Sequence, residues 1–363
     1  MTQLRTVQVL GGGSAGSSAH VRSLAAGLVA RGVRVTVCAP VDVDRVYDFS
    51  GSGAHHVAVP RRGDPSSVAT LRAACAGADV VHAHGVHAAV RAAIALGGRR
   101  IPLVVTWHTR GQTDGPRGHL LRLLERRAVR AAAVVLGTSS DLVDRARSRG
   151  ARDARLAPVA LPASRRPVGG PESKARAELG AVERPLLMAV GSLRPDQGYD
   201  TLLDAAGIWR GLDPAPLLTV AGEGRERGRL QRRIDTEELP VRLIGRRDDI
   251  AELLAAADIA LLPSRWEARS VLAQEALRLG VPLVATAVGG VPELVGDAAE
   301  LVPYGDVTAL SDAVVRLLGD PDRRRWLAAA GRIQAESWPT EDETIAQVLC
   351  VYDELASSPR PTR

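Results

Sequence analysis

Short apolar runs alternate with amphipathic segments along most of the chain. In the first 165 residues, each apolar run has the length of a buried strand and is followed by apolar residues at helical spacing. This alternation is typical of a parallel sheet covered by helices. The strands predicted there are residues 6–10, 34–38, 80–82, 103–107 and 132–136, and the first predicted helix covers about 18–31.

The alternation is interrupted once. Residues 158–175 are rich in proline and glycine, and we interpret them as a linker. Further strands are predicted at 186–190, 217–221, 241–244, 259–262, 282–285 and 299–302. The sequence therefore predicts two doubly wound α/β domains, residues 1–165 and 171–338, followed by a C-terminal helix within residues 342–363 that begins near Asp342.

Composition narrows the class of protein. No run among the 363 residues is long enough to span a bilayer, and the N-terminus lacks a signal-like pattern, so we expect a cytoplasmic protein. Its three cysteines, Cys38, Cys75 and Cys350, do not suggest a disulfide framework or a thiolate metal site. Aromatic residues make up only 3%, too few for base stacking, so no nucleic-acid partner is expected.

Charge is divided unevenly between the two predicted domains. Residues 1–165 hold 23 basic and 10 acidic side chains, and the remainder holds 24 basic and 31 acidic ones. The first domain should therefore attract anions that the second does not. Within it, residues 114–130 have the pattern of a basic amphipathic helix, which predicts either an anionic membrane surface as partner or an ordinary solvent-facing helix.

The first predicted strand runs into three successive glycines, Gly11, Gly12 and Gly13, and the segment 11–16 formally fits a dinucleotide-binding pattern. That function also needs an acidic residue at the end of the second strand, where Val37 is followed by Cys38, Ala39 and Pro40. The three glycines still predict a loop whose backbone can approach a ligand closely, because glycine has no side chain.

Two segments suggest a metal weakly. His82, His84 and His87 cluster after a strand, but without a carboxylate or cysteine at ligand spacing. Asp42 and Asp44 form a D-x-D triplet, which we interpret as a solvated turn. We expect no metal and no cofactor.

The clearest candidate chemistry lies at residues 261–277. An apolar strand ends there, a turn follows, and Ser270 stands where a helix N-cap belongs. The helix N-terminus would offer free N–H groups and a positive dipole end to an anion such as a diphosphate. Glu267 on the loop is placed to reach a sugar hydroxyl, and Glu275 on the helix a ribose diol. Elsewhere, His108 ends an apolar strand where cleft residues of an open α/β sheet project, although a satisfied loop histidine fits the sequence equally well.

Several motifs, in their order and spacing, resemble those of the retaining glycosyltransferases of family 4. They are the glycine loop followed by His20, the His82–His84 segment, the strand ending at His108, and segments 190–198, 220–224, 257–264 and 280–294, with the Glu267/Glu275 pair between the last two. The resemblance implies the GT-B fold, in which two Rossmann-like domains face each other across a cleft. The C-terminal helix crosses back onto the first domain in similar proteins.

The resemblance also implies roles for single residues. The second domain would bind a nucleoside-diphosphate sugar without a metal, with Glu275 on the ribose, Glu267 facing the transferred sugar and the amides of Ser270, Val271 and Leu272 on the diphosphate. Arg246 would line the base pocket within segment 245–247, and Gly222 belongs to a matching loop. From the first domain, His108 would lie at the reaction centre and Gly12 and Gly13 would close on the phosphates.

This chain departs from the family pattern where the usual arginine and lysine are replaced by Ser192 and Gln197. Negative charge on a departing nucleoside diphosphate still needs cations or dipoles. Arg194 and Arg269 are the predicted substitutes, since arginine binds phosphate bidentately. We expect a glycosyltransferase whose acceptor is a lipid or a small polyol, and a non-catalytic relative or an epimerase or hydrolase on the same fold as alternatives.

Overall fold

The fold follows from two sets of parallel strands. The computed structural model describes residues 3–11, 15–60, 64, 66–110, 115–160 and 172–357. These divide into two compact units, Met1–Pro162 with Pro339–Arg363, and Ala163–Trp338. The predicted domain limits at 165 and 171, and much of the predicted linker, lie outside the described residues. Helix α7 already begins at Glu172, inside the segment predicted as linker.

The first unit holds a seven-stranded, fully parallel sheet in the order β3-β2-β1-β4-β5-β6-β7. Its chain order reverses between β1 and β4, and in open α/β sheets ligands bind at the carboxyl ends of the strands at such a reversal. The strands are β1 (Arg5–Leu10), β2 (Arg34–Ala39), β3 (His55–Ala58), β4 (Val80–His84), β5 (Leu103–Trp107), β6 (Val134–Gly137) and β7 (Ala154–Leu156).

The helices of the first unit alternate with its strands, because each parallel crossover needs a covering segment. They are α1 (Ala15–Ala30), α2 (Val41–Tyr47), the short 3-10 helix η1 (Ser50–Ser52), α3 (Ser66–Ala74), α4 (Val86–Leu96), α5 (Gly115–Ala131) and α6 (Ser140–Ser148).

The second unit repeats the design with six parallel strands in the order β10-β9-β8-β11-β12-β13. Here the reversal lies between β8 and β11. The strands are β8 (Leu186–Val190), β9 (Leu217–Ala221), β10 (Val241–Gly245), β11 (Ile259–Leu262), β12 (Leu283–Thr286) and β13 (Glu300–Val302). The helices are α7 (Glu172–Leu179), the 3-10 helix η2 (Pro195–Gln197), α8 (Tyr199–Trp209), α9 (Arg227–Thr236), α10 (Ile250–Ala255), α11 (Val271–Leu279), α12 (Val291–Val295), α13 (Val307–Gly319) and α14 (Pro321–Glu336).

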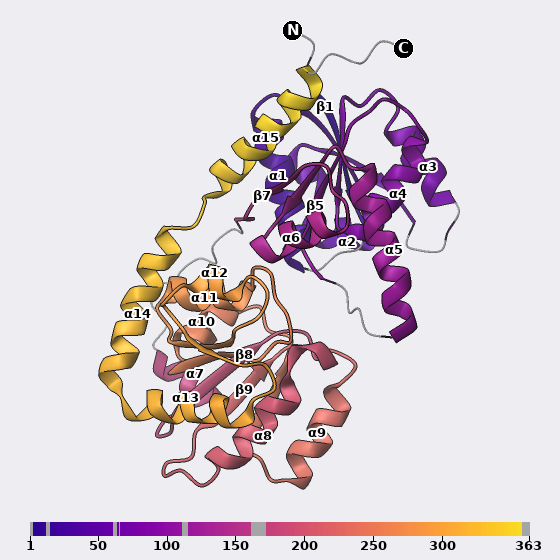
Figure 1. Cartoon of the computed structure of the whole chain (residues 1–363). Coiled ribbons are helices and arrows are strands. Elements are labelled where there is room, and N and C mark those ends of the chain that lie inside the picture. Colours follow the sequence, from indigo (N-terminus) through magenta and orange to yellow (C-terminus); the bar gives the residue numbers. More distant parts are fainter. Residues whose placement is uncertain are drawn as a thin grey trace. The chain divides into compact units, whose positions relative to one another are not determined.

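The C-terminal helix α15 (Glu341–Ser357) lies alongside α1 and belongs to the first unit (Figure 1). Ile345 packs against Gly27 so closely that a Cβ at Gly27 would lie 2.1 Å from Ile345 Cδ1. Glu341 accepts a hydrogen bond from Ser23, Asp342 pairs with Arg31, and Arg155 donates to Glu354 at 2.8 Å. Apolar packing and ion pairs thus fix this helix on the first sheet's helical layer.

Two expectations about local structure were wrong. Asp42 and Asp44 lie in helix α2 and not in a solvated turn. Carboxylates are favourable in the first turn of a helix, and Asp44 also contacts His56 at 3.2 Å and accepts from the Phe49 amide. The edge strands β3 and β7, which had no strong apolar run, were not predicted.

Candidate functional site

In the second unit, three loops touch through their backbones at the reversal point of the sheet. A Cβ at Gly222 would lie 1.8 Å from the Gly191 carbonyl oxygen, and one at Gly198 would lie 1.9 Å from that of Pro263. Both glycines have positive φ, 153° and 72°. The loops after β8, β9 and β11 therefore require glycine at these points and form a compact polar edge.

Glu267 lies at this edge. Its Oε1 is 3.5 Å from Gln197 Nε2, at the long limit of a hydrogen bond, and its backbone oxygen accepts from the Gly290 amide at 2.9 Å. Burial raises the pKa of Glu267, against the lowering effect of the Gln197 hydrogen bond and of the Arg194 charge. The structure thus brings three of the predicted residues, Glu267, Gln197 and Arg194, to one place.

Helix α11 begins as the sequence predicts. Ser270 is its N-cap and accepts from the Ala273 amide at 3.3 Å. The first turn of such a helix has N–H groups without intrahelical partners, so Val271 and Leu272 lie at an anion-favouring end. Glu275 is buried one turn further on, and its Oε1 accepts from Arg278 Nη1 at 3.1 Å.

The predicted arginines differ in their surroundings. Arg194 donates to Asp196 Oδ2 at 2.8 Å and its side chain is 54% exposed, so its charge is shared with a neighbour on its own loop. Arg246 is 78% exposed and 4.0 Å from Asp248. Of the three predicted arginines, Arg194, Arg246 and Arg269, Arg194 is the one whose charge lowers the pKa of Glu267.

Arg269 is directed elsewhere. Its guanidinium carbon lies 5.8 Å from the centre of the Trp338 ring, and burial lowers its pKa to about 10. Among the described residues its Nε and Nη2 atoms find no hydrogen-bond partner. The contact with Trp338 gives this arginine a packing role that the sequence did not indicate.

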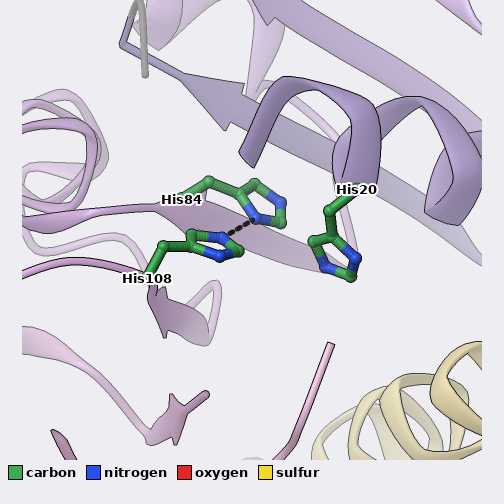
Figure 2. A group of neighbouring side chains, drawn as sticks. All are labelled: His20, His84 and His108. Carbon is green, nitrogen blue, oxygen red and sulfur yellow. Dashed lines mark hydrogen bonds between the residues drawn. The ribbon is translucent and has the colours of Figure 1, made fainter. Parts of the chain in front are cut away.

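In the first unit, three histidines converge at the reversal point between β1 and β4. His20 comes from α1, His84 ends β4, and His108 follows β5 (Figure 2). His84 Nδ1 and His108 Nε2 are 3.3 Å apart, and the ring of His20 meets the other two edge-on at 5.7 and 5.4 Å. Of the three histidines that are neighbours in the sequence, His82 and His84 lie together, with ring centroids 4.3 Å apart, whereas His87 is exposed on α4.

These imidazoles are neutral at physiological pH. Burial lowers the pKa of His20 to about 4 and takes those of His84 and His108 well below the usual value, with neighbouring histidines adding to the effect in the latter two. Each residue can offer one nitrogen so that the three lie within 4.8 Å of one another, a donor set that suits a zinc-like ion. The hydrogen bond between His84 and His108 puts a proton on one of the two facing nitrogens and uses the lone pair of the other, however, so neither of these two nitrogens can bind a metal while the bond is formed.

Sequence reasoning missed the residues behind the histidines. Gln8, a polar residue within an apolar strand, accepts from His84 Nε2 at 3.0 Å and donates to the Tyr352 hydroxyl at 3.0 Å. Tyr352 comes from α15, far along the chain. The interruption of an apolar run by Gln8 was a signal that could have been used, whereas nothing local marks Tyr352.

Of the basic segment 114–130, residues 115–130 lie in α5 (Gly115–Ala131), and Asp114 lies outside the described residues. The inner side of this helix carries the fully buried Glu125, which binds Arg145 at 2.8 Å and Arg149 at 2.9 Å on or beside α6. Its outer side exposes Leu120 and Leu123. Gly12 and Gly13 lie outside the described residues.

Both units have the doubly wound α/β form, and each gathers its candidate residues where ligands bind in open parallel sheets. Comparison with protein families agrees with that class. The model described as "Glycosyl transferase 4-like domain" matches residues 15–162, and that described as "Glycosyl transferases group 1" matches residues 172–334. The chain belongs to the group 1 glycosyltransferases, which confirms the predicted family.

Two curated relatives are informative. A "GDP-mannose-dependent monoacylated alpha-(1-6)-phosphatidylinositol monomannoside mannosyltransferase" of Corynebacterium glutamicum is 35% identical over 195 residues, 49% of this chain and 51% of that protein. A "D-inositol 3-phosphate glycosyltransferase" of Salinispora arenicola is 31% identical over 295 residues, 72% of this chain and 65% of that protein. The chain thus spans about half the length of the first relative.

Solved structures agree on the fold. Anabaena HepE in complex with UDP-glucose has a TM-score of 0.82 at 21% identity, covering 96% of this chain and 100% of that one. Sucrose-phosphate synthase of Thermosynechococcus elongatus has a TM-score of 0.80 at 22% identity, covering 99% and 100%. The predicted two-domain Rossmann-like fold is confirmed. In the described part of the chain, no helix combines the length and the apolar character that crossing a membrane requires.

Proposed function

We propose that this protein transfers a sugar from a nucleoside-diphosphate sugar to an acceptor with retention of configuration and without a bound metal. The observation that carries the proposal is the contact of Glu267 with Gln197 beside the N-terminus of α11, at the reversal point of the second sheet. Family membership supports it, as do one relative whose name specifies GDP-mannose and two solved structural neighbours in complex with UDP or UDP-glucose.

In this proposal the donor's diphosphate binds at the amides of Ser270, Val271 and Leu272, and its ribose at Glu275. Gly222 and Arg246 contribute from the neighbouring loops, with Ser192 and Gln197 at the positions where the family has its cations. Glu267 faces the transferred sugar. Since Glu275 already accepts from Arg278, ribose binding requires its other carboxylate lone pairs.

The leaving diphosphate develops charge that must be stabilised without a metal. Arg194 is the better-placed substitute cation, because it already acts on Glu267. Arg269 remains a second proposed cation, although its contact with Trp338 means that its guanidinium would have to turn. In the first unit, we propose that His108 acts on the transferred sugar and that Gly12 and Gly13, which lie outside the described residues, act on the phosphates.

For the acceptor we propose a lipid or a small polyol, because the two relatives are named for a phosphatidylinositol mannoside and for inositol phosphate. Helix α5 would bind to an anionic membrane surface. It exposes two leucines, Leu120 and Leu123, and three arginines, Arg126, Arg127 and Arg130. We expect the protein to pellet with anionic but not with neutral vesicles, and to be released by salt. Equal pelleting with both lipids would contradict this.

The unpaired cysteines support a cytoplasmic location.

The decisive experiment is a transfer assay with EDTA present. Purified protein is incubated with UDP- and GDP-sugars, with and without inositol phosphate or phosphatidylinositol vesicles, and products are identified by mass spectrometry and by the anomeric proton coupling. The proposal predicts a retained glycoside that forms only with acceptor. Nucleotide release without acceptor would indicate a hydrolase or epimerase, and donor binding without turnover a non-catalytic relative. Loss of activity on chelation would contradict metal independence.

A further inference from the structure

Behind His84 and His108 lies a buried chain of hydrogen bonds that ends on the C-terminal helix. We propose that Tyr352 is a positioning residue that, through Gln8, holds His84 and His108 as their Nε2–H tautomers, so that His108 presents Nδ1 as a hydrogen-bond acceptor to a sugar hydroxyl. What His108 binds rests on the proposed function. The tautomers do not, because they follow from the orientation of the Gln8 carboxamide and from contacts within the first unit.

The chain begins at the Tyr352 hydroxyl, which is fully buried. It accepts from Gln8 Nε2 at 3.0 Å and lies 2.6 Å from His82 Nδ1. A phenol has one proton to donate, and the proton of the Gln8 amide already points at its oxygen. The hydroxyl also has a proton of its own, which needs an acceptor because the group is buried, and it donates this proton to His82 Nδ1 at 2.6 Å.

This fixes the direction of the hydrogen bonds in the first branch of the chain, which runs from Tyr352 through His82 to Thr106. With a lone pair at Nδ1, neutral His82 carries its proton at Nε2 and donates it to Thr106 Oγ1 at 2.6 Å. Burial lowers the pKa of His82 to about 3, so the doubly protonated ring does not compete.

The second branch leads to the candidate site. With its amide directed at Tyr352, Gln8 turns Oε1 to His84, which must donate from Nε2 at 3.0 Å. His84 Nδ1 is then a lone pair and accepts from His108 Nε2 at 3.3 Å. His108 keeps an unprotonated Nδ1. This nitrogen accepts from a hydroxyl and repels a carboxylate or phosphate, which specifies a neutral, hydroxylated ligand.

The opposite polarity is internally consistent as well, and this makes the assignment testable. If the Gln8 carboxamide were flipped, every bond in the chain would reverse, and His108 would donate from Nδ1. Removing the Tyr352 hydroxyl leaves the Gln8 amide with Thr6 Oγ1 at 3.4 Å, and a hydroxyl can accept from Gln8 Nε2 or donate to Gln8 Oε1, so neither orientation of the carboxamide is then favoured. Tyr352→Phe should therefore mix the two forms.

The test is ¹⁵N NMR of histidine-labelled full-length protein at neutral pH with EDTA, with signals assigned from His84→Gln and His108→Gln variants. Wild type should show His84 and His108 protonated only at Nε2, and Tyr352→Phe a mixture at both rings. Tyr47→Phe, the matched substitution elsewhere in the first unit, should leave the tautomers unchanged. Protonation of His84 at Nδ1 in wild type would overturn the proposal whether or not the variant folds, and so would an unchanged spectrum of a folded Tyr352→Phe.

Kinetics provide the second readout. Tyr352→Phe should lower kcat/KM about tenfold through misorientation of His108 and should alter the acidic limb of the pH–rate profile, whereas Tyr47→Phe should do neither. Nε2–H tautomers in a protein that transfers no sugar would refute the proposed function and leave the positioning role intact. Normal transfer by a Tyr352→Phe protein with mixed tautomers would overturn the positioning role and leave the proposed function intact.

Discussion

The two units have the same architecture but opposite solutions for the polar groups at the sheet's reversal point. In the first unit these groups are buried imidazoles that stay neutral and hydrogen-bond to one another. In the second they are mainly arginines and carboxylates that form ion pairs, such as the half-exposed pair of Arg194 and Asp196. A buried group avoids the cost of desolvation by losing its charge, whereas a half-exposed one keeps it and finds a counter-ion.

Acid should reveal this difference most strongly. Burial lowers the folded-state pKa of His20 to about 4 and that of His82 to about 3, so the unfolded chain binds more protons below the ordinary value of 6.5. The stability of the first unit is therefore complete above pH 6.5 and falls as pH drops towards 4, by about 1.4 kcal/mol per pH unit for each histidine.

The second unit should respond differently to acid. The raised pKa of Glu267 means that protonation of this carboxylate favours the folded state. Hydrogen bonds from Arg229 and Arg247 lower the pKa values of Asp200 and Asp249, so the stability that these carboxylates contribute is lost only below about pH 4. Hydrogen exchange at pH 6.5 and 5.0, corrected for intrinsic rates, should show β4 losing protection before β8. Simultaneous loss in both strands would contradict the comparison.

The next effect is catalytic. Glu267→Gln should lower kcat about 10³-fold, since it removes a charge placed against the transferred sugar, with little change in donor affinity. Steady-state rates and donor titration measure the two quantities. Glu183→Gln, at an exposed glutamate that precedes β8, is the matched control. A comparable fall in the control, or a normal rate in Glu267→Gln, would remove the proposed role.

A backbone substitution tests the contact between loops. Gly222→Ala places a Cβ 1.8 Å from the Gly191 oxygen at φ 153°, so the loops after β8 and β9 must separate. We expect a loss of about 3 kcal/mol in unfolding free energy of the second unit, by urea denaturation. Gly207→Ala, where the nearest atom would be 3.7 Å away, should not destabilise it. Equal stability of the two variants would show that the loops tolerate separation.

The smallest expected effect concerns the substitute cation. Arg194→Ala should weaken nucleoside-diphosphate binding about tenfold, whereas Arg246→Ala should change it about twofold or less, because Arg246 contributes mainly through its backbone. Calorimetry on both variants compares them directly. A larger loss of affinity in Arg246→Ala than in Arg194→Ala would indicate that the diphosphate is bound by the arginine of the β10 loop and not by that of the β8 loop.

The sequence predicted what depends on local pattern. All six strands of the second unit were found, because buried parallel strands are continuous apolar runs. The Ser270 cap was found because its signal is contained in four residues. The edge strands β3 and β7 were missed, since they are only partly buried and lack such runs.

What depends on distant neighbours was not predicted. His20, His84 and His108 come from three separate parts of the chain, and spacing alone grouped His84 with His82 and His87 and not with His20 and His108. The pairing of Arg194 with Asp196, the contact of Arg269 with Trp338 and the hydrogen bonds of Tyr352 depend on side-chain orientation. A sequence places a residue on an element but does not give the partner that it meets there.

One measurement tests the central claim most directly: calorimetric titration of UDP and GDP into wild type and Glu275→Ala, with EDTA present. The proposed donor site predicts that wild type binds at least one of the two without metal, and that Glu275→Ala binds it at least tenfold more weakly because the ribose diol loses its acceptor. Equal affinity in the two proteins, or binding that requires a divalent ion, would contradict the account.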